Sequence, residues 1–258
     1  MITGAAVRKT LKALVPSIGL SFCIVIGASE ASARECSTAA LSAFRVPNMT
    51  ITSARDVPAA VSRPQYCDVK GAVETNGEGA GAGSANFEAM LPSNWNGKFV
   101  FRGVGGLAGA LRSSANPADE DLFLVRGYAT AITDTGHINT DPTWEFISPG
   151  KPNTPKILDY FYRAAHQVTL AAKQIVKDYY GSATISHSYF DGCSNGGKMG
   201  LIEATRYPDD YDGVISGSPW LDPLGTSLWS LKNTQALLYG YIPPSLFLAV
   251  DCCNQETV

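Results

Sequence analysis

The feature that most constrains the fold of this 258-residue chain is a serine between two glycines, at the junction of a strand-like and a helix-like stretch. Gly192, Ser194 and Gly196 fit the pattern G-x-S-x-G, which by itself is also common in ordinary turns. β-prone residues precede the pattern from Ile185, and apolar residues at helical spacing follow it from Met199. A serine on so sharp a turn needs small neighbours, because a side chain at either glycine would collide with the adjoining strand or helix. The stretch therefore predicts a nucleophile elbow, with Ser194 as the candidate nucleophile.

The first 33 residues have the pattern of a secretory signal peptide. Basic residues among the first twelve precede an apolar core at 14–26, and an A-x-A cleavage motif follows at 31–33. The mature chain is expected to begin near Arg34. No later stretch approaches the apolar length of a membrane span. We therefore expect an exported protein, periplasmic or secreted, with no membrane partner.

Composition excludes some classes of function and leaves others open. The hydrophobic content of 45% is enough to bury a substantial core, and the length suits one domain or one domain with an insertion. The formal net charge of −3 gives no electrostatic footprint for nucleic acid. We expect a globular protein that does not bind nucleic acid, whose oligomeric state the sequence leaves open.

The cysteines predict at least one disulfide. Five cysteines follow the signal peptide: Cys36, Cys67, Cys193, Cys252 and Cys253. Because this number is odd, at least one of them lacks a partner within the chain. Most should be paired in an oxidising compartment. We expect Cys36 to pair with Cys67, because both precede the core and no other cysteine follows for more than 100 residues. Two unrelated buried thiols are the alternative.

Strand and helix signals alternate from residue 85 to residue 217 and predict an open, mainly parallel sheet with flanking helices, an α/β fold. Strands are expected at 85–91, 98–101, 127–133 and 212–217 and before the elbow; helices are expected at 156–180 and after the elbow. We expect a polar lead-in at 34–84, with a hairpin loop at 78–84, and a core at 85–219. The segment 220–258 is rich in Trp, Leu and Tyr and is expected to be a helical cap or further core.

A glycine-rich run, RGVGGLAG at 102–109, has two functional interpretations. Gly103, Gly105 and Ala108 fit the G-x-G-x-x-A form of a dinucleotide loop, which also needs a crossover helix and an acidic ribose ligand. The alternative is a loop whose backbone N–H groups bind an oxyanion. We favour the oxyanion loop, because an exported protein seldom meets a soluble nicotinamide cofactor. A plain structural turn is the third interpretation.

Asp134 and His137 follow the predicted strand at 127–133 and are candidate site-lining residues. Polar residues at the carboxyl end of such a strand face the crevice in which α/β proteins bind ligands. Alternatively, Asp134 caps a turn and His137 is a surface loop residue. His166, in mid-helix, and His187, in the strand before the elbow, are expected to be structural.

Several separate motifs, in the right order, resemble those of the tannase and feruloyl esterase family of secreted serine esterases. The resemblance runs from Cys36 to about Pro244. Its motifs are DTGH at 134–137, DYFYRAAH at 159–166, YYG at 179–181, GCSNGGKMGL at 192–201 and RYPDDYDGVISGSP at 206–219.

The resemblance implies an α/β-hydrolase fold with a lid inserted after the elbow, and a carboxylic ester hydrolase acting on aromatic esters of the gallate or ferulate type. Acyl transfer would use Ser194, with the backbone N–H groups of Asn195 and of Gly105 or Gly106 as oxyanion donors. No cofactor is implied, although family lids carry a calcium site whose ligands would lie beyond this chain. In the family the cysteine before the nucleophile, here Cys193, pairs with a cysteine beside the catalytic histidine.

The sequence also departs from the family pattern. Family members place the catalytic acid and base after the elbow and the lid, whereas His137, His166 and His187 all precede Ser194. We therefore expect an amino-terminal portion of such an enzyme, with most of the lid missing, the partner of Cys193 outside the chain, and weak or no activity alone. A non-catalytic secreted binding module or a truncated pseudoenzyme on the same scaffold is the alternative.

Overall fold

The computed structural model describes residues 33–240 except 45, 78, 112–121, 139–141 and 182–183. The expected signal peptide up to residue 32, and Cys252 and Cys253, lie outside the described residues.

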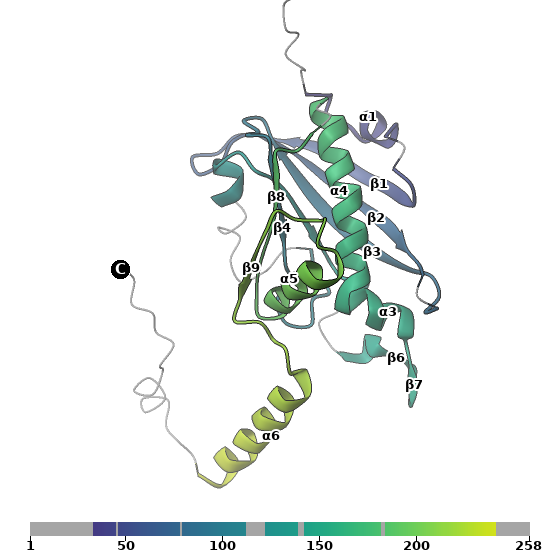
Figure 1. Ribbon diagram of the computed structural model, residues 1–258, viewed down its shortest axis with the longest axis vertical. Helices are drawn as coiled ribbons and strands as arrows, with labels where there is room; N and C mark the ends of the chain where they lie inside the picture. The colour runs from purple at the N-terminus through teal and green to yellow at the C-terminus, as the bar shows by residue number, and fades with distance from the viewer. Residues whose placement is uncertain are drawn as a thin grey trace, which may run out of the picture. The chain divides into compact units, whose positions relative to one another are not determined.

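A seven-stranded mixed sheet, in the order β1-β2-β3-β5-β4-β8-β9, forms the centre of the fold (Figure 1). Its strands are β1 (Met49–Val57), β2 (Tyr66–Thr75), β3 (Gly83–Pro92), β4 (Lys98–Arg102), β5 (Ala129–Thr133), β8 (His187–Cys193) and β9 (Gly213–Gly217). Neighbours from β1 to β5 pair antiparallel, whereas β5, β4, β8 and β9 pair parallel. The expected α/β architecture is confirmed, with the parallel pairing confined to one half of the sheet.

The expected lead-in at 34–84 contributes two strands, β1 and β2, to this same sheet. The polar sequence of β1 conceals this, because β1 lies at the sheet edge and leaves most of its side chains partly or fully exposed, whereas β2 lies inside the sheet and is mostly buried. The expected hairpin loop connects β2 to β3, which pair from Thr75 and Gly83 onward. Cys36, just before α1 (Thr38–Ser42), and Cys67 of β2 form the expected disulfide, with their Cα atoms 5.7 Å apart.

The helix expected at 156–180 is present but is not uniform. It begins with α3 (Thr154–Leu158), passes through a π-helical turn, η2 (Asp159–Arg163), and continues as α4 (Ala164–Tyr180). Gly181 ends α4 in the left-handed conformation, φ 61°, which glycine adopts without steric cost. Apolar spacing predicts the helix but cannot reveal the π-helical turn, a feature that occurs often at functional sites.

Two helices pack on one face of the sheet. α4 lies over β2, β3 and β5, and α5 (Asn195–Arg206) lies beside it over β8 and β9 (Figure 1). Between helices and sheet, large apolar side chains are completely buried: Phe87, Phe99, Phe101, Phe190 and Ile175. Each contributes about 1.5–3 kcal/mol to stability relative to exposure. This core fixes the strand ends that carry the candidate site.

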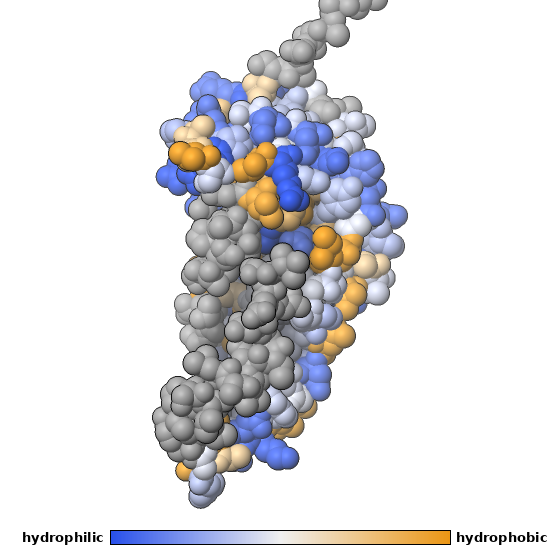
Figure 2. All heavy atoms as spheres, turned by 90° about the vertical axis from the view of Figure 1, so that its left-hand side faces the viewer, coloured by the Kyte–Doolittle hydropathy of each residue, from blue (hydrophilic) through white to orange (hydrophobic). Residues whose placement is uncertain are grey.

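The remaining elements lie outside this core. They are the 3-10 helix η1 (Pro142–Glu145), a hairpin of β6 (Phe146–Ser148) and β7 (Lys151–Pro152), and α6 (Pro223–Tyr239). No side chain of α6 is buried among the described residues, so this segment forms a helix but no core. On the face drawn in Figure 2, apolar side chains occur in small groups between hydrophilic ones. None of the helices in the described ranges is long and apolar enough to cross a membrane.

Candidate active site

Ser194 occupies the turn between β8 and α5, as the sequence predicts. Its φ of 59° and ψ of −118° are strained for a residue with a side chain. The Ser194 N–H donates to Gly217 O at 3.0 Å, and its carbonyl accepts from the N–H of Lys198 at 3.0 Å and of Trp220 at 2.9 Å. Backbone bonds to β9, to α5 and to the segment after β9 therefore hold the strained turn, and its side chain is left exposed.

Glycines allow this turn to touch the glycine-rich loop, residues 103–109, backbone to backbone. A Cβ on Gly192 would lie 2.5 Å from Gly196 O, and one on Gly196 would lie 2.8 Å from the carbonyl carbon of Gly103. A Cβ on Gly103 would in turn lie 2.7 Å from Gly196 Cα. No side chain fits at these distances. The three glycines thus bring the glycine-rich loop against the elbow.

Side chains also hold the glycine-rich loop, through its carbonyl groups. Three of its carbonyl groups accept a hydrogen bond from a buried side chain: Val104 O from Asn195 Nδ2 at 2.9 Å, Gly106 O from Tyr160 Oη at 3.0 Å, and Leu107 O from His137 Nε2 at 2.6 Å. In the part of the chain that the structure describes, the N–H groups of Gly105 and Gly106 have no acceptor. The Asn195 N–H belongs to the first turn of α5, where amides lack an intrahelical partner.

Asp134 supports the end of β5. Its side chain is 3% exposed and accepts hydrogen bonds from Asn86 N at 2.9 Å, Asn86 Nδ2 at 2.6 Å and Gly136 N at 2.9 Å. Burial raises the pKa of Asp134, and these three bonds act in the opposite direction. The carboxylate therefore ties the end of β5 to β3. This agrees with the alternative interpretation, in which Asp134 caps a turn.

His137 is buried rather than a surface loop residue. It is 2% exposed and stacks on Trp144, with ring centres 4.1 Å apart. Burial lowers the pKa of His137, so the ring is neutral at pH 7 and donates through Nε2 to the glycine-rich loop. His137 and Asp134 both line a polar cavity of about 530 Å³.

A second cavity, of about 510 Å³, is lined mainly by aromatic and apolar side chains and lies beside the glycine-rich loop. Its rings are Trp144, Tyr160, Phe161 and Trp220, and Leu107 belongs to the loop itself. The backbone N–H of Trp220 donates to Ser194 O, so the cavity adjoins both the loop and the elbow. Tyr160 and Phe161 belong to the DYFYRAAH motif, but the sequence did not indicate that they face a cavity.

Lys198 lies one turn after Ser194 on α5 and is 4% exposed. Its Nζ has no hydrogen-bond partner among the described residues and is 4.1 Å from the ring centre of Tyr160 and 4.5 Å from that of Phe161. Burial lowers the pKa of Lys198 to about 8. The rings that line the aromatic cavity therefore also surround a cation, which their faces attract.

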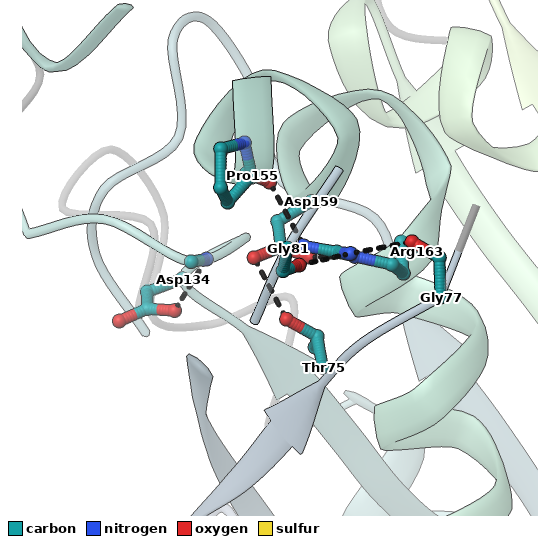
Figure 3. Close-up of polar contacts among 8 residues, drawn as sticks. Thr75, Gly77, Gly81, Asp134, Pro155, Asp159 and Arg163 are labelled. Carbon is teal, nitrogen blue, oxygen red and sulfur yellow. Dashed lines mark hydrogen bonds and ion pairs between the residues drawn. The ribbon is translucent and has the colours of Figure 1, made fainter. Parts of the chain in front are cut away.

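A buried ion pair between Asp159 and Arg163 fixes the π-helical turn that carries Tyr160 (Figure 3). Arg163 Nε lies 2.6 Å from Asp159 Oδ1, and Thr75 donates to Asp159 Oδ2 at 2.8 Å. Arg163 also donates to the carbonyl groups of Gly77, Gly81 and Pro155, at 3.3, 3.0 and 3.1 Å. The turn is thus joined to the β2–β3 loop.

His166 and His187 do not contact the elbow serine. His166 Nδ1 lies 2.7 Å from Asp210 Oδ2 and its ring stacks on Tyr207, whereas His187 is exposed at the start of β8. No described side chain hydrogen-bonds to Ser194 Oγ. Cys193 is exposed and has no disulfide partner in the described ranges.

His166, Glu203 and Asp210 place possible metal-ligand atoms within 4.8 Å of one another. Burial raises the pKa of Glu203 to about 9, so its carboxyl is protonated at neutral pH. The Lys173 ammonium donates to the Asp210 carbonyl in the same cluster. A neutral acid and a nearby cation both weaken binding of a divalent ion, so we assign no metal to this cluster.

Comparison with known proteins gives a consistent result. Residues 67–251 match the family model described as tannase and feruloyl esterase. A probable feruloyl esterase of Arthroderma benhamiae is 36% identical over 147 residues, which are 54% of this chain and 26% of that protein. The mono(2-hydroxyethyl) terephthalate hydrolase of Piscinibacter sakaiensis is 33% identical over 185 residues, 69% of this chain and 30% of that protein.

The solved structure of feruloyl esterase B from Aspergillus oryzae superposes with a TM-score of 0.57 at 28% identity, covering 68% of this chain and 36% of that chain. The matched part of this chain spans only 26–30% of the length of the two relatives from Arthroderma benhamiae and Piscinibacter sakaiensis. The fold is that of the α/β-hydrolases, as expected. The chain belongs to the tannase and feruloyl esterase family.

Proposed function

We propose that this chain carries the nucleophile and the oxyanion hole of a carboxylic ester hydrolase, which acts on aromatic esters of the gallate or ferulate type through an acyl-enzyme on Ser194. The observation that carries the proposal is the strained Ser194 turn held against the glycine-rich loop by the contact between Gly103 and Gly196. Strain of this kind persists where a side chain must be presented for function.

Ser194 Oγ would attack the ester carbonyl and form a tetrahedral intermediate with a negatively charged oxygen. The N–H groups of Asn195 and of Gly105 or Gly106 would donate to that oxygen. Each donor in a comparable site contributes about 2.7–4 kcal/mol to transition-state stabilisation. The Ser194 proton passes to solvent water and the alcohol or phenol takes up a proton from water as it leaves, so the acyl group stays on Ser194. A water molecule then adds to the acyl carbonyl, releases the acid and restores the Ser194 hydroxyl.

Hydrolysis at full rate also needs a general base and an acid that orients it. The described histidines bond to Leu107 or Asp210 or lie exposed at the start of β8, so none serves Ser194. A site without one member of the triad retains about 10³–10⁴ of acceleration over water. We therefore expect this chain alone to acylate slowly and to deacylate more slowly still. No cofactor takes part.

Two observations support an aromatic substrate. The relatives are named for feruloyl and terephthalate esters, both of which have an aromatic acyl group. The cavity beside the glycine-rich loop is lined by four aromatic side chains, on which a ring could stack at about 0.5–1.5 kcal/mol per pair beyond area burial. Export is supported by the signal-peptide pattern and by the Cys36–Cys67 disulfide.

An activated ester tests the proposal, because slow deacylation lets the acyl-enzyme accumulate. We expect p-nitrophenyl ferulate to add one feruloyl group per chain by intact mass spectrometry, on Ser194 by peptide mapping, and p-nitrophenyl butyrate to add its acyl group more slowly. Ser194→Ala should abolish the adduct, and Ser218→Ala, a change at an exposed serine after β9, should retain it. No adduct, or an adduct on another residue, would overturn the proposal. Saturable ferulate binding without an adduct would instead identify a binding module.

A further inference from the structure

Tyr160 bridges the glycine-rich loop and the helix that carries the elbow. Its Oη donates to Gly106 O at 3.0 Å, and Lys198 Nζ of α5 lies 4.1 Å from its ring centre. The side chain is 5% exposed. We propose that Tyr160 is a positioning residue, which orients the N–H groups of the glycine-rich loop for the oxyanion; this inference rests on the function proposed above. Burial raises the pKa of Tyr160 to about 12, so its hydroxyl remains a donor at neutral pH.

The geometry of the peptide bond explains how a bond to a carbonyl orients an amide. The C=O of one residue and the N–H of the next lie in one plane and point in opposite directions. The bond from Asn195 to Val104 O therefore also orients the N–H of Gly105. In the same way, the bond from Tyr160 to Gly106 O fixes the peptide plane that carries the Leu107 N–H, and so restrains Gly106, whose own N–H is a proposed oxyanion donor, from its C-terminal side.

Four successive carbonyls of the loop have a donor, and Tyr160 supplies one of them. The donors are Asn195 Nδ2 for Val104 O, Ala108 N for Gly105 O, Tyr160 Oη for Gly106 O and His137 Nε2 for Leu107 O. Glycine has a wide choice of backbone angles, and neither Gly105 nor Gly106 has an atom within 4 Å of a Cβ position. The space at these two Cβ positions is open, so the hydrogen bonds to the loop carbonyls are what restrain the backbone there.

Tyr160 itself has little freedom to move. It lies in η2 beside Asp159, whose buried ion pair with Arg163 is 2.6 Å long. The rings of Trp144 and Phe161 surround it, with ring centres 5.1 and 5.4 Å away. Replacing tyrosine by phenylalanine removes the bond to Gly106 and leaves this packing in place.

Tyr180 offers a matched control on the same helical segment. It is 8% exposed, and its hydroxyl donates to the carbonyl of Pro92 at 2.7 Å. Pro92 ends β3 and does not belong to the glycine-rich loop. Tyr180→Phe therefore removes the same chemical group and the same kind of bond, at a position with no contact to the loop.

The test compares Tyr160→Phe with Tyr180→Phe in the full 258-residue chain. The first readout is amide hydrogen exchange of the peptide that contains residues 103–109, which does not depend on activity. The second is inactivation by an aryl fluorophosphonate, separated into the maximal rate and the concentration that gives half of it. We expect Tyr160→Phe to speed exchange in the loop and to lower the maximal rate about tenfold, since a misplacement of a catalytic group by about 1 Å costs about 100-fold and the loop keeps its other hydrogen bonds. The half-saturating concentration should stay unchanged, and Tyr180→Phe should resemble the wild type in both readouts.

Each alternative outcome has a clear meaning. Equal exchange in Tyr160→Phe and wild type would overturn the inference, and so would faster exchange with an unchanged maximal rate of inactivation. An equal fall in the maximal rate of inactivation of Tyr180→Phe would show a general loss of stability and would also overturn the inference. If the wild type is not labelled at all, the proposed function fails, and loop exchange alone decides whether Tyr160 holds the loop.

Discussion

The two sides of the glycine-rich loop are held in opposite ways. On the elbow side, Gly103 and Gly196 meet through bare backbone, at distances that exclude a Cβ. On the other side, Tyr160 and His137 hold the loop carbonyls through side-chain hydrogen bonds, and Asn195 adds one from the elbow itself. The absence of side chains thus lets the loop approach the elbow closely, and side-chain hydrogen-bond donors orient the loop carbonyls.

We call the side of the loop that Tyr160 and His137 hold the support side. The largest expected effect comes from this side, through the ion pair of Asp159 and Arg163 in the same π-helical turn as Tyr160. Arg163→Met should destabilise the protein by about 4 kcal/mol, because the Asp159 carboxylate would remain buried without its cation. Urea denaturation measures this change. Arg206→Met, at an exposed arginine that stacks on Tyr162, should cost less than about 1 kcal/mol. A similar cost for both variants would contradict the role given to the ion pair.

On the elbow side, Gly196→Ala should cost about 2–3 kcal/mol, because its Cβ would overlap the backbone of Gly103, which cannot move without displacing the loop. Gly105→Ala is the matched control, since no atom lies within 4 Å of its Cβ position. It should be as stable as the wild type or up to about 1 kcal/mol more stable. Thermal and urea unfolding of the two variants decide the matter; equal stabilities would mean that the backbone contact is not tight.

A smaller, pH-dependent effect is expected at His137. Its folded-state pKa lies below the ordinary value of 6.5, so the unfolded chain takes up a proton first as the pH falls. The contribution of His137 to stability is therefore present above pH 6.5 and is lost as the pH falls toward the lower folded-state pKa. His137→Gln has no titrating ring and keeps an N–H donor for Leu107.

Urea unfolding of wild type and His137→Gln at pH 7.5 and pH 5.5 measures this difference. The stability of the wild type relative to the variant should fall at the lower pH. A relative stability that does not change, or that rises on acidification, would show that His137 is not held neutral.

The elbow was predictable because everything it needs lies within a few residues. Gly192, Ser194 and Gly196 are neighbours in sequence, and strand and helix signals flank them. The support side was not predictable, because its partners are distant. Tyr160 lies 54 residues from Gly106, and Arg163 lies 86 residues from Gly77. Tyr160 and Arg163 both belong to DYFYRAAH, one of the motifs that carry the family resemblance. A motif does not show which backbone groups its side chains reach.

Asp134 and His137 show a limit of reasoning from strand ends. Their position after β5 places them at the crevice edge, and both line a cavity there. The Asp134 carboxylate, however, bonds to Asn86 and Gly136, and His137 Nε2 bonds to Leu107. β1 shows another limit: a polar strand at a sheet edge has no clear alternation, so the sequence suggested a lead-in where the structure has β1 and β2 of the mixed sheet.

The most direct test of the central claim is a crystal structure of the chain after reaction with an aryl fluorophosphonate. We predict phosphorus bonded to Ser194 Oγ and a phosphonyl oxygen about 2.7–3.1 Å from the backbone nitrogens of Asn195 and of Gly105 or Gly106. The aryl group should occupy the cavity lined by Trp144 and Trp220. A phosphonyl oxygen that points to solvent, bonded to neither the elbow nor the loop, would contradict the account.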